Sequence, residues 1–244
     1  MSPDAGPLQA GLAPSGGRLR YAAGAGAPFR LVLASNNAKK LSELRALFGG
    51  LRLELLPQGA LGIAEAEEPH HTFVENALEK ARAAARACGG AAMADDSGLC
   101  VDALGGAPGV ESAHFSPLLP IAGEVQADRE TLRRAQDAAN NALLLQRLAG
   151  RNAPHERRAR FVSTLVALRS ADDPEPLIVS GRWEAEILAE PRGAGGFGYD
   201  PLVWIPALGR GVAELSADEK NSHSHRALAA RQMLSLMREV WRLD

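Results

Sequence analysis

The chain has few cysteines: Cys88 and Cys100 are the only two among 244 residues, and they form no Cys-x-x-Cys motif. Two thiols at this spacing predict neither a disulfide framework nor a zinc site, but reduced thiols in a cytoplasmic protein. The sequence also lacks any run of the roughly 18 apolar residues that a membrane span needs. No basic segment followed by an apolar core opens the chain. We therefore expect neither membrane insertion nor a secretory signal.

An excess of charge of one sign is lacking as well. The 27 basic side chains nearly balance the 29 acidic ones, and the formal net charge is -2. A protein that binds duplex nucleic acid normally carries a marked basic excess, so we expect no nucleic-acid partner. A small anionic substrate is compatible with this balance, because a pocket can be locally positive on a nearly neutral protein.

Residues 1–28 lack any hydrophobic period and are rich in alanine, glycine and proline. Such a segment cannot bury enough apolar surface to offset its ordering entropy, so we expect a disordered N-terminal extension. Residues 29–244 show no internal repeat and no linker, and 46% of the whole chain is apolar. A chain of this length can build a hydrophobic core without metal or disulfide support, so residues 29–244 are expected to form one domain.

Hydrophobic periodicity predicts strands that alternate with helices and then an antiparallel hairpin, which indicates an α/β protein with a mixed central β-sheet flanked by helices. Thr72 and Glu75 match a capping box that starts one helix, and Gly89 is placed to end it. The expected strands cover residues 29–34, 53–56, 91–94, 160–168, 177–188 and 202–205. The other expected helices cover residues 41–48, 125–149 and 224–242.

The segment Ser35-Asn36-Asn37-Ala38-Lys39-Lys40 joins the first expected strand to the first helix. A helix N-terminus offers unpaired N–H groups and the positive end of the helix dipole, so it suits a phosphate, and Lys40 could neutralise that phosphate. The alternative is an ordinary Ser/Asn helix cap followed by solvated lysines. The segment has no glycines and is not a Walker loop.

The segment Asp95-Asp96-Ser97-Gly98 is expected at the end of the strand over residues 91–94. Ligands of open α/β sheets bind beyond the carboxyl ends of strands. Adjacent carboxylates on an extended chain point to opposite sides, so one could face the site while the other braces the loop. Asp96 could hold a metal or act as a base, and Glu68 could supply a second oxygen ligand, a sparse set that suits magnesium. The alternative is a polar turn.

Two further segments could contact a ligand. In Gly195-Gly196-Phe197-Gly198-Tyr199-Asp200-Pro201 the glycines allow close approach and Phe197 could stack on a flat base, although a tight bend with a core aromatic is an equal alternative. The segment from Glu219 to Arg226 places cationic and hydrogen-bonding groups just before or at the last helix. No Cys or His partner lies at metal spacing from His223 and His225, so a zinc site is not expected.

Each motif is weak alone, but their order is specific. They are Ser35-x-Asn37-x-x-Lys40, Thr72-Phe73-x-Glu75-Asn76-Ala77-x-x-Lys80-Ala81, Asp95-Asp96-Ser97-Gly98-Leu99, Gly105-Gly106-Ala107-Pro108-Gly109, Gly196-Phe197-Gly198-Tyr199-Asp200-Pro201 and Glu219-Lys220-Asn221 with Ser224-His225-Arg226. In this order they resemble the inosine/xanthosine triphosphate pyrophosphatase family over about residues 29–242. The resemblance implies two lobes with the active-site cleft between them, a homodimer, and hydrolysis of ITP, dITP and XTP to the monophosphate and pyrophosphate, which clears deaminated purines from the nucleotide pool.

The resemblance also implies roles for individual residues. Glu68 and Asp96 would hold magnesium (Mg²⁺), and Asp96 would be the catalytic base, although a carboxylate bound to a metal is a poor base. Phe197 would stack on the purine. The substrate-binding residues implied are Ser35, Asn37, Lys40, Ser97, Phe197, Gly198, Tyr199, Asp200, Lys220, His225 and Arg226.

Three departures from the family pattern affect this transfer: His114 stands where an arginine is usual, residues 116–127 look like an insertion, and His223 replaces an apolar residue. Two other functions remain open. One is a related pyrophosphatase that acts on modified or pyrimidine nucleoside triphosphates, which a substrate panel would separate. The other is a nucleotide-sensing module without catalysis, which would bind nucleotide but release no pyrophosphate.

Overall fold

The computed structural model describes residues 27–117 and 129–244. Residues 1–26 of the predicted extension and residues 118–127 of the predicted insertion lie outside this part of the chain. Seven strands and five α-helices are formed by the described residues. The strands are β1 (Phe29–Leu33), β2 (Leu53–Pro57), β3 (Ala92–Val101), β4 (Arg158–Leu168), β5 (Leu177–Ile187), β6 (Val203–Ile205) and β7 (Arg210–Gly211). The helices are α1 (Ala38–Phe48), α2 (Phe73–Cys88), α3 (Arg129–Arg147), α4 (Ala217–His223) and α5 (His225–Glu239).

All seven strands belong to one mixed sheet in the order β2-β1-β3-β4-β5-β6-β7. Strand β1 is parallel to both of its neighbours, β2 and β3. Every other pair is antiparallel. The predicted α/β class and mixed sheet are confirmed, whereas the two-lobed arrangement remains a prediction.

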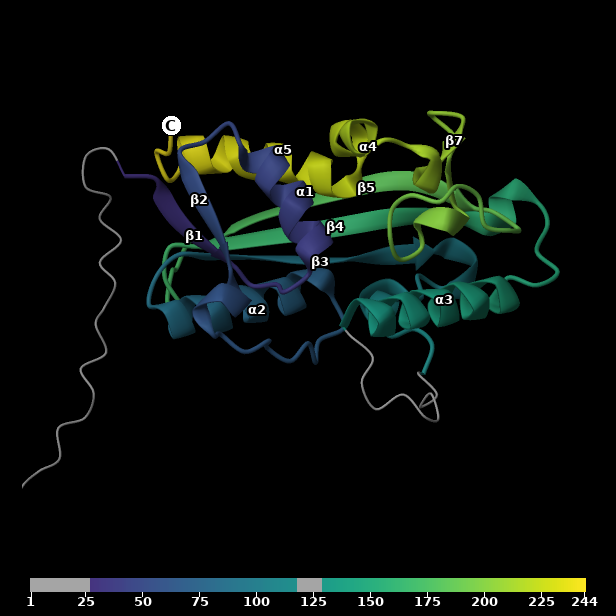
Figure 1. The fold of residues 1–244 in the computed structure, drawn as a ribbon, viewed down its shortest axis with the longest axis horizontal. Coiled ribbons are helices and arrows are strands. Elements are labelled where there is room, and N and C mark those ends of the chain that lie inside the picture. The colour runs from purple at the N-terminus through teal and green to yellow at the C-terminus, as the bar shows by residue number, and fades with distance from the viewer. Residues whose placement is uncertain (1–26, 118–128) are drawn as a thin grey trace, which may run out of the picture.

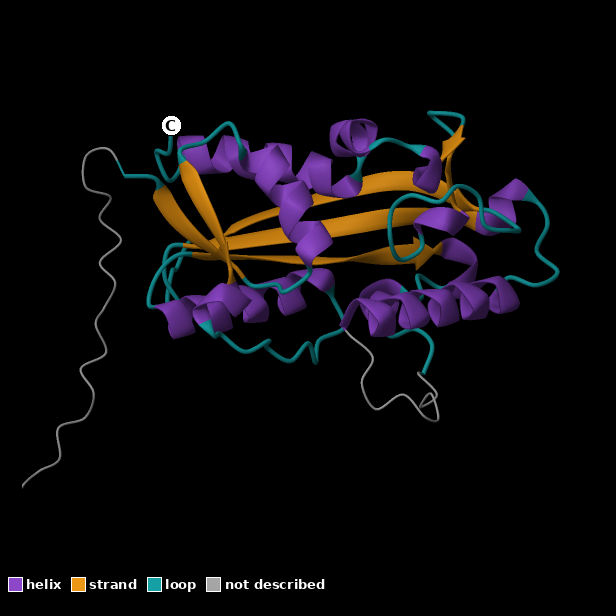
Figure 2. Ribbon diagram, in the orientation of Figure 1, coloured by secondary structure: helices purple, strands orange, loops and turns teal. Residues whose placement is uncertain are grey.

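Helices cover both faces of the sheet (Figure 1). Helices α1, α4 and α5 lie on one side, and α2 and α3 lie on the other (Figure 2). Across residues 27–117 and 129–244, no helix has the length and apolar character needed to cross a membrane.

Local signals in the sequence account for the helix ends. Asn37 caps α1, since its side-chain oxygen accepts the N–H groups of Lys39 and Lys40 at 3.1 and 3.2 Å. Thr72 forms the predicted cap of α2 by accepting the N–H of Glu75 at 3.3 Å. Gly89 ends α2 in the left-handed conformation, with φ of 66°.

Strand β3 is longer than predicted. The expected strand over residues 91–94 continues to Val101, so the Asp95-Asp96-Ser97-Gly98 segment lies inside a strand, and its placement at a strand end was wrong. The reason is tertiary: β4 pairs with β3 along its whole length, from Ala92 opposite Leu168 to Val101 opposite Ala159. Strand β1 pairs with β3 only as far as Met93. Beyond Met93, the edge of β3 that faces β1 is therefore not covered by that strand.

Candidate active site

A cavity of about 480 Å³ lies along β3 beyond Met93, where Asp95, Ser97, Gly98 and Leu99 line it. Its walls come from the β1–α1 junction, the segment before α2, the middle of β3, residues 112–114, the first half of α3, the segment after β5 and the start of α5. All but one of the residues predicted for the site line it: Ser35, Asn37, Lys40, Glu68, Ser97, Phe197, Gly198, Tyr199, Asp200, Lys220, His225 and Arg226. The exception is Asp96. Its Oδ1 lies 2.8 Å from Nζ of Lys80, and Lys80 lines the cavity.

The start of α1 presents both features that the sequence left as alternatives. Asn37 is an ordinary helix cap, and Ser35 supports it by accepting the Asn37 N–H through its hydroxyl at 3.1 Å. The same residues line the cavity together with Lys40. The first turn of α1 thus points the positive end of its dipole at the cavity, so capping and anion binding are compatible here.

Asp95 has no solvent exposure in its side chain and receives donors from four residues. Its carboxylate accepts from Ser163 at 2.7 Å, from Ser97 at 3.1 Å and from the Arg226 guanidinium at 3.1 Å, and it pairs with Lys40 at 3.1 Å. Burial works to raise the pKa of Asp95, but Lys40 and Arg226 outweigh it, so the pKa lies well below its ordinary value. Asp95 therefore fixes two of the cations that line the cavity, Lys40 and Arg226.

The ion pairs continue from Arg226 to Lys220, which lies beside the ring of Phe197. Arg226 contacts Glu43, and Glu43 lies 3.4 Å from Nζ of Lys220. Lys220 in turn pairs with Asp200 at 2.7 Å. Three cations and three carboxylates alternate through this chain of contacts, so by formal charge the network is neutral.

On the other side of β3, Lys80 holds two carboxylates. Its Nζ lies 3.0 Å from Glu68 and 2.8 Å from Asp96. Burial and the neighbouring Glu68 carboxylate raise the pKa of Asp96 to about 6. Burial also works to raise the pKa of Glu68, but Lys80 outweighs it and the pKa of Glu68 is lowered. One cation facing two carboxylates leaves a surplus negative charge when both are ionised.

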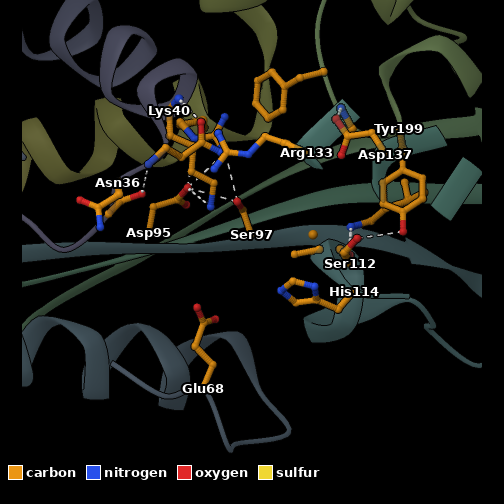
Figure 3. A pocket seen from close by; sticks show the side chains of 18 of the residues that line it. Asn36, Lys40, Glu68, Asp95, Ser97, Ser112, His114, Arg133, Asp137 and Tyr199 are labelled. Carbon is orange, nitrogen blue, oxygen red and sulfur yellow. Dashed lines mark hydrogen bonds and ion pairs between the residues drawn. The ribbon is translucent and has the colours of Figure 1, made fainter. Parts of the chain in front are cut away.

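Figure 3 shows this division: Lys40 and Asp95 lie on one side of β3, and Glu68 lies on the other. The strand alternation that separates adjacent side chains accounts for it. The expectation that Asp95 and Asp96 point in different directions is therefore confirmed. Asp95 belongs to the network of ion pairs that runs from Lys40 to Asp200. Asp96 belongs to the Lys80 cluster, which consists of Glu68, Lys80 and Asp96.

The Lys80 cluster fits a divalent metal. Oδ2 of Asp96 is buried and has no hydrogen-bond partner among the described residues, which is the state of a free ligand oxygen. Glu68 and Asp96 are two carboxylates only, and the described residues contain no group of three or more His, Cys, Asp or Glu side chains arranged to hold a metal. A site with two carboxylates suits a cation that keeps water and substrate phosphates in its coordination shell, as magnesium does.

His225 is one of the hydrogen-bonding groups that the segment from Glu219 to Arg226 brings to the cavity. Its imidazole is buried and stacks on Phe161, with ring centroids 4.9 Å apart. Burial, with Arg226 nearby, lowers the pKa of His225 well below its ordinary value, so the ring is neutral at pH 7. His225 therefore offers a neutral ring to the cavity, while Arg226 supplies the charge at the start of α5. His114 lines the cavity and is exposed, and His223 is exposed.

The face of Phe197 is bordered by cations. Nζ of Lys220 lies 4.5 Å from the ring centroid, and Nζ of Lys39 lies 5.6 Å from it. The Phe197 N–H donates to Asp200 at 2.9 Å, which fixes the backbone of the turn. An aromatic ring beside hydrogen-bond donors is suited to a flat heterocycle with carbonyl edges.

Sequence reasoning assigned no role to several residues that organise the site. Glu43 follows Lys40 by three residues, which places both on one face of α1, so helical spacing could have indicated it. Lys80 belongs to the motif from Thr72 to Ala81, from which no role for its side chain is predicted. For Asp95 the sequence predicts only that it or Asp96 faces the site while the other braces the loop. Asp137 carried no local signal, because it approaches Gly198 from 61 residues away.

The fold and the cavity define an α/β protein whose binding site combines a helix N-terminus, paired cations, a dicarboxylate cluster and an aromatic ring. Residues 31–236 match the model of the Ham1 family, and the chain belongs to this family. The predicted resemblance is confirmed.

Among curated relatives, the dITP/XTP pyrophosphatase of Methylibium petroleiphilum is 68% identical over 87% of this chain and 99% of its own. That of Leptothrix cholodnii is 65% identical over 88% and 99%. Among solved structures, a HAM1 protein from Coxiella burnetii is 40% identical, with a TM-score of 0.73 over 86% of this chain and 99% of its own.

Proposed function

We propose that this chain hydrolyses the non-standard purine nucleoside triphosphates ITP, dITP and XTP to the monophosphate and pyrophosphate. The observation that carries the proposal is the 68% identity to a dITP/XTP pyrophosphatase across 87% of the chain. The cavity supports it, because cations suited to a polyphosphate and the aromatic ring of Phe197, suited to a base, line the same cavity. The activity would remove deaminated purines from the nucleotide pool.

Binding of the triphosphate would fall to the start of α1 and to Lys40. Lys40 is committed to Asp95 at 3.1 Å, and burial lowers the pKa of Lys40. A phosphate must therefore share this cation with a carboxylate, and the neutral network offers no surplus positive charge of its own. The substrate consequently needs a further cation.

Magnesium is the cation we propose, held by Glu68 and Asp96. When bound, such a metal offsets phosphate charge and polarises the bond to be broken. Asp96 is also the candidate base, and the two roles compete, because a metal lowers the basicity of its ligand. Lys80 would keep both carboxylates in place through its contacts of 3.0 and 2.8 Å.

Selection against adenine follows from hydrogen bonding around Phe197, whereas guanine carries the same acceptor oxygen and differs in its 2-amino group. Hypoxanthine and xanthine carry an acceptor oxygen where adenine carries an amino donor. A buried donor such as the Lys220 ammonium would pair with that oxygen but would face the amino group of adenine unpaired. The penalty is about 1–3 kcal/mol, or roughly 5- to 150-fold in affinity.

The deciding experiment measures pyrophosphate release with magnesium from inosine, xanthosine, adenosine, guanosine, uridine and thymidine triphosphates. We expect fast release from the first two alone. A preference for uridine or thymidine triphosphate would favour the pyrimidine alternative, and tight binding without release would favour the sensing module. Asp96→Asn should lower turnover by orders of magnitude with an unchanged circular dichroism spectrum, and near-normal activity would refute the role of Asp96.

We also propose that the chain forms a cytoplasmic homodimer and has neither a nucleic-acid nor a membrane partner. Sedimentation equilibrium at micromolar concentration should give twice the mass of the chain, which is 25.7 kDa. A monomer across the measured range would contradict the proposed assembly but not the proposed activity.

A further inference from the structure

Side chains of helix α3 form hydrogen bonds with both the backbone N–H and the backbone carbonyl oxygen of Gly198. The carboxylate of Asp137 accepts the Gly198 N–H at 2.9 Å, and the Asn141 amide donates to the Gly198 carbonyl oxygen at 3.0 Å. Asp137 and Asn141 are four residues apart, so they lie on one face of the helix. The side-chain oxygen of Asn141, Oδ1, is buried and has no hydrogen-bond partner among the described residues, so the bond from Nδ2 to Gly198 orients this side chain.

The helix is itself fixed to the framework of the site. Asn140 donates to the carbonyl oxygens of Ser112 and Ala113 at 3.2 and 3.1 Å. Gln136 donates to the carbonyl oxygen of Ser116 at 2.8 Å. The next residue after Gly198, Tyr199, donates its hydroxyl to the same Ser112 carbonyl oxygen at 2.9 Å. The Gly198 clamp, formed by Asp137 and Asn141, is therefore tied to Ser112, whose hydroxyl accepts the N–H of Leu99 in β3 at 2.9 Å.

The segment that carries Phe197 needs such support. Gly193, Gly195, Gly196 and Gly198 lie within six residues, and Gly198 adopts the left-handed conformation with φ of 62°. Glycines lose the most conformational entropy on ordering, so this segment does not fix its own shape. Within it, Asp200 bonds to Phe197 from the C-terminal side, and α3 bonds to Gly198 from outside.

We propose that Asp137 and Asn141 are positioning residues that hold Phe197 where it stacks on the base of a purine nucleotide. The inference deepens the proposed function and rests on it for the identity of the base. The clamp acts on the base end of the cavity, whereas Lys40 and the Lys80 cluster serve the phosphate end. Loss of the clamp should therefore weaken binding of a nucleotide but not of a phosphate chain that has no base.

Equilibrium binding of the two proposed products, inosine monophosphate and pyrophosphate, measures the affinity for the base and for the phosphate chain separately and needs no turnover. Inosine monophosphate probes the base end together with one phosphate, and inorganic pyrophosphate probes the phosphate end alone. For Asp137→Ala we expect the Kd of inosine monophosphate to rise roughly tenfold, the effect of losing one charge-assisted hydrogen bond. The Kd of pyrophosphate should stay within about twofold. Asp137→Asn, whose amide oxygen can still accept the Gly198 N–H, should restore most of the nucleotide affinity.

Two comparisons make the test specific. Gln146→Ala removes an exposed side chain two turns further along α3 and should change neither Kd. In a Phe197→Ala background, Asp137→Ala should have little additional effect, because the ring that it positions is gone. An equal rise for both probes, an unchanged nucleotide Kd in Asp137→Ala, or additive effects with Phe197→Ala would each overturn the positioning role.

The same proteins distinguish failure of the clamp from failure of the proposed function. If the unmodified chain releases no pyrophosphate from ITP and XTP, the catalytic proposal fails, while the two Kd values still decide the role of Asp137. If the unmodified chain turns over ITP and Asp137→Ala leaves KM unchanged, the clamp fails and the catalytic proposal stands.

Discussion

Asp95 illustrates how one side chain serves both stability and binding. A carboxylate without solvent exposure is costly unless donors satisfy it, and here Ser163, Ser97, Lys40 and Arg226 do so. The same contacts hold Lys40 and Arg226 at the cavity. Removing Asp95 would therefore leave the buried Arg226 and the partly buried Lys40 with fewer partners, and the penalty for unpaired charge would add to the loss of their positions.

We predict that Asp95→Asn lowers the free energy of unfolding by about 3–5 kcal/mol, the usual cost of breaking a buried ion pair from one side. Urea denaturation would measure it. Asp102→Asn is the matched control, because Asp102 pairs with Arg160 at an exposed position and its loss should cost about 1 kcal/mol or less. Equal losses in the two variants would refute the structural role of Asp95.

We predict that Asp173 contributes a pH-dependent part of the free energy of unfolding. It is 5% exposed and accepts the N–H groups of Arg169 and Glu175 at 2.8 and 3.1 Å, in the turn between β4 and β5. Burial works to raise its pKa, but the Arg169 side chain and these N–H groups outweigh it, so the pKa lies below the ordinary 3.8. The stabilisation is thus complete above about pH 4 and is lost as the pH falls through the lower, folded-state pKa.

In Asp173→Asn that contribution is absent at every pH. We expect the variant to be less stable by about 1.5–3 kcal/mol at pH 7, the value of hydrogen bonds to a charged group. The difference from the unmodified chain should shrink as the pH is lowered below 4. Denaturant midpoints measured from pH 7 to pH 2.5 would show this, and a difference that stays constant with pH would contradict it.

At the scale of elements, the contact between β5 and α5 places the last segment of the site. A Cβ built on Gly181 would lie 2.0 Å from the carbonyl oxygen of His225 and 2.6 Å from the amide nitrogen of Ala229. Both of these atoms are helix backbone and cannot move aside alone. The absence of a side chain at Gly181 therefore allows α5 to begin against the sheet, where His225 and Arg226 reach the cavity.

We predict that Gly181→Ala displaces the start of α5, destabilises the fold by about 1–3 kcal/mol as overpacking does, and lowers nucleotide affinity at least tenfold. Thermal denaturation and nucleotide Kd would measure the two effects. Gly50→Ala is the control, because its nearest contact would be Nη2 of Arg238 at an ordinary 3.5 Å. A normal Kd in Gly181→Ala would show that the α5 start does not depend on this contact.

The sequence predicted elements well where the cause was local. The Thr72 cap and the Gly89 end of α2 are examples, because each depends on residues within one turn. It failed for β3, because the length of that strand is decided by pairing with β4, about seventy residues away. The same reason applies to the site. The motifs predict that Lys40 and Arg226 belong to one site, and both line the cavity. Their common partner Asp95 and the contact of Asp137 with Gly198 are long-range contacts that spacing cannot show.

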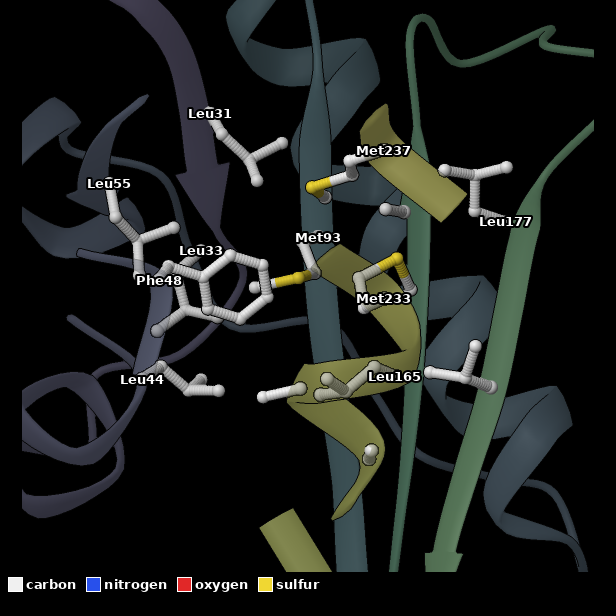
Figure 4. Close-up of a cluster of buried hydrophobic side chains, with 14 of the residues drawn as sticks. Leu31, Leu33, Leu44, Phe48, Leu55, Met93, Leu165, Leu177, Met233 and Met237 are labelled. Carbon is white, nitrogen blue, oxygen red and sulfur yellow. The ribbon is translucent and has the colours of Figure 1, made fainter. Parts of the chain in front are cut away.

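At the scale of the whole molecule, two large clusters of buried apolar side chains share the same strands. One cluster packs Leu165 of β4 and Met233 of α5 with Leu33 and Met93 (Figure 4). The other contains Phe161 of the same strand β4, together with Trp183 and Ile205. Since Phe161 and Leu165 are four residues apart on one continuous strand, loss of either cluster removes support from the other.

We predict that the molecule unfolds as one unit and not as the two separate lobes that the sequence resemblance implies. Leu165→Ala and Ile205→Ala each empty a fully buried position, one in each cluster, and should each cost about 2–5 kcal/mol. If strands β3, β4 and β5 couple the clusters, each variant shifts the midpoint of a single transition, with coincident far-ultraviolet circular dichroism and tryptophan fluorescence. Two separate transitions, with each variant moving only one, would instead show that the lobes are independent. In that case the cavity along β3 would lie between units able to open against each other, and nucleotide binding would couple them by stabilising both transitions.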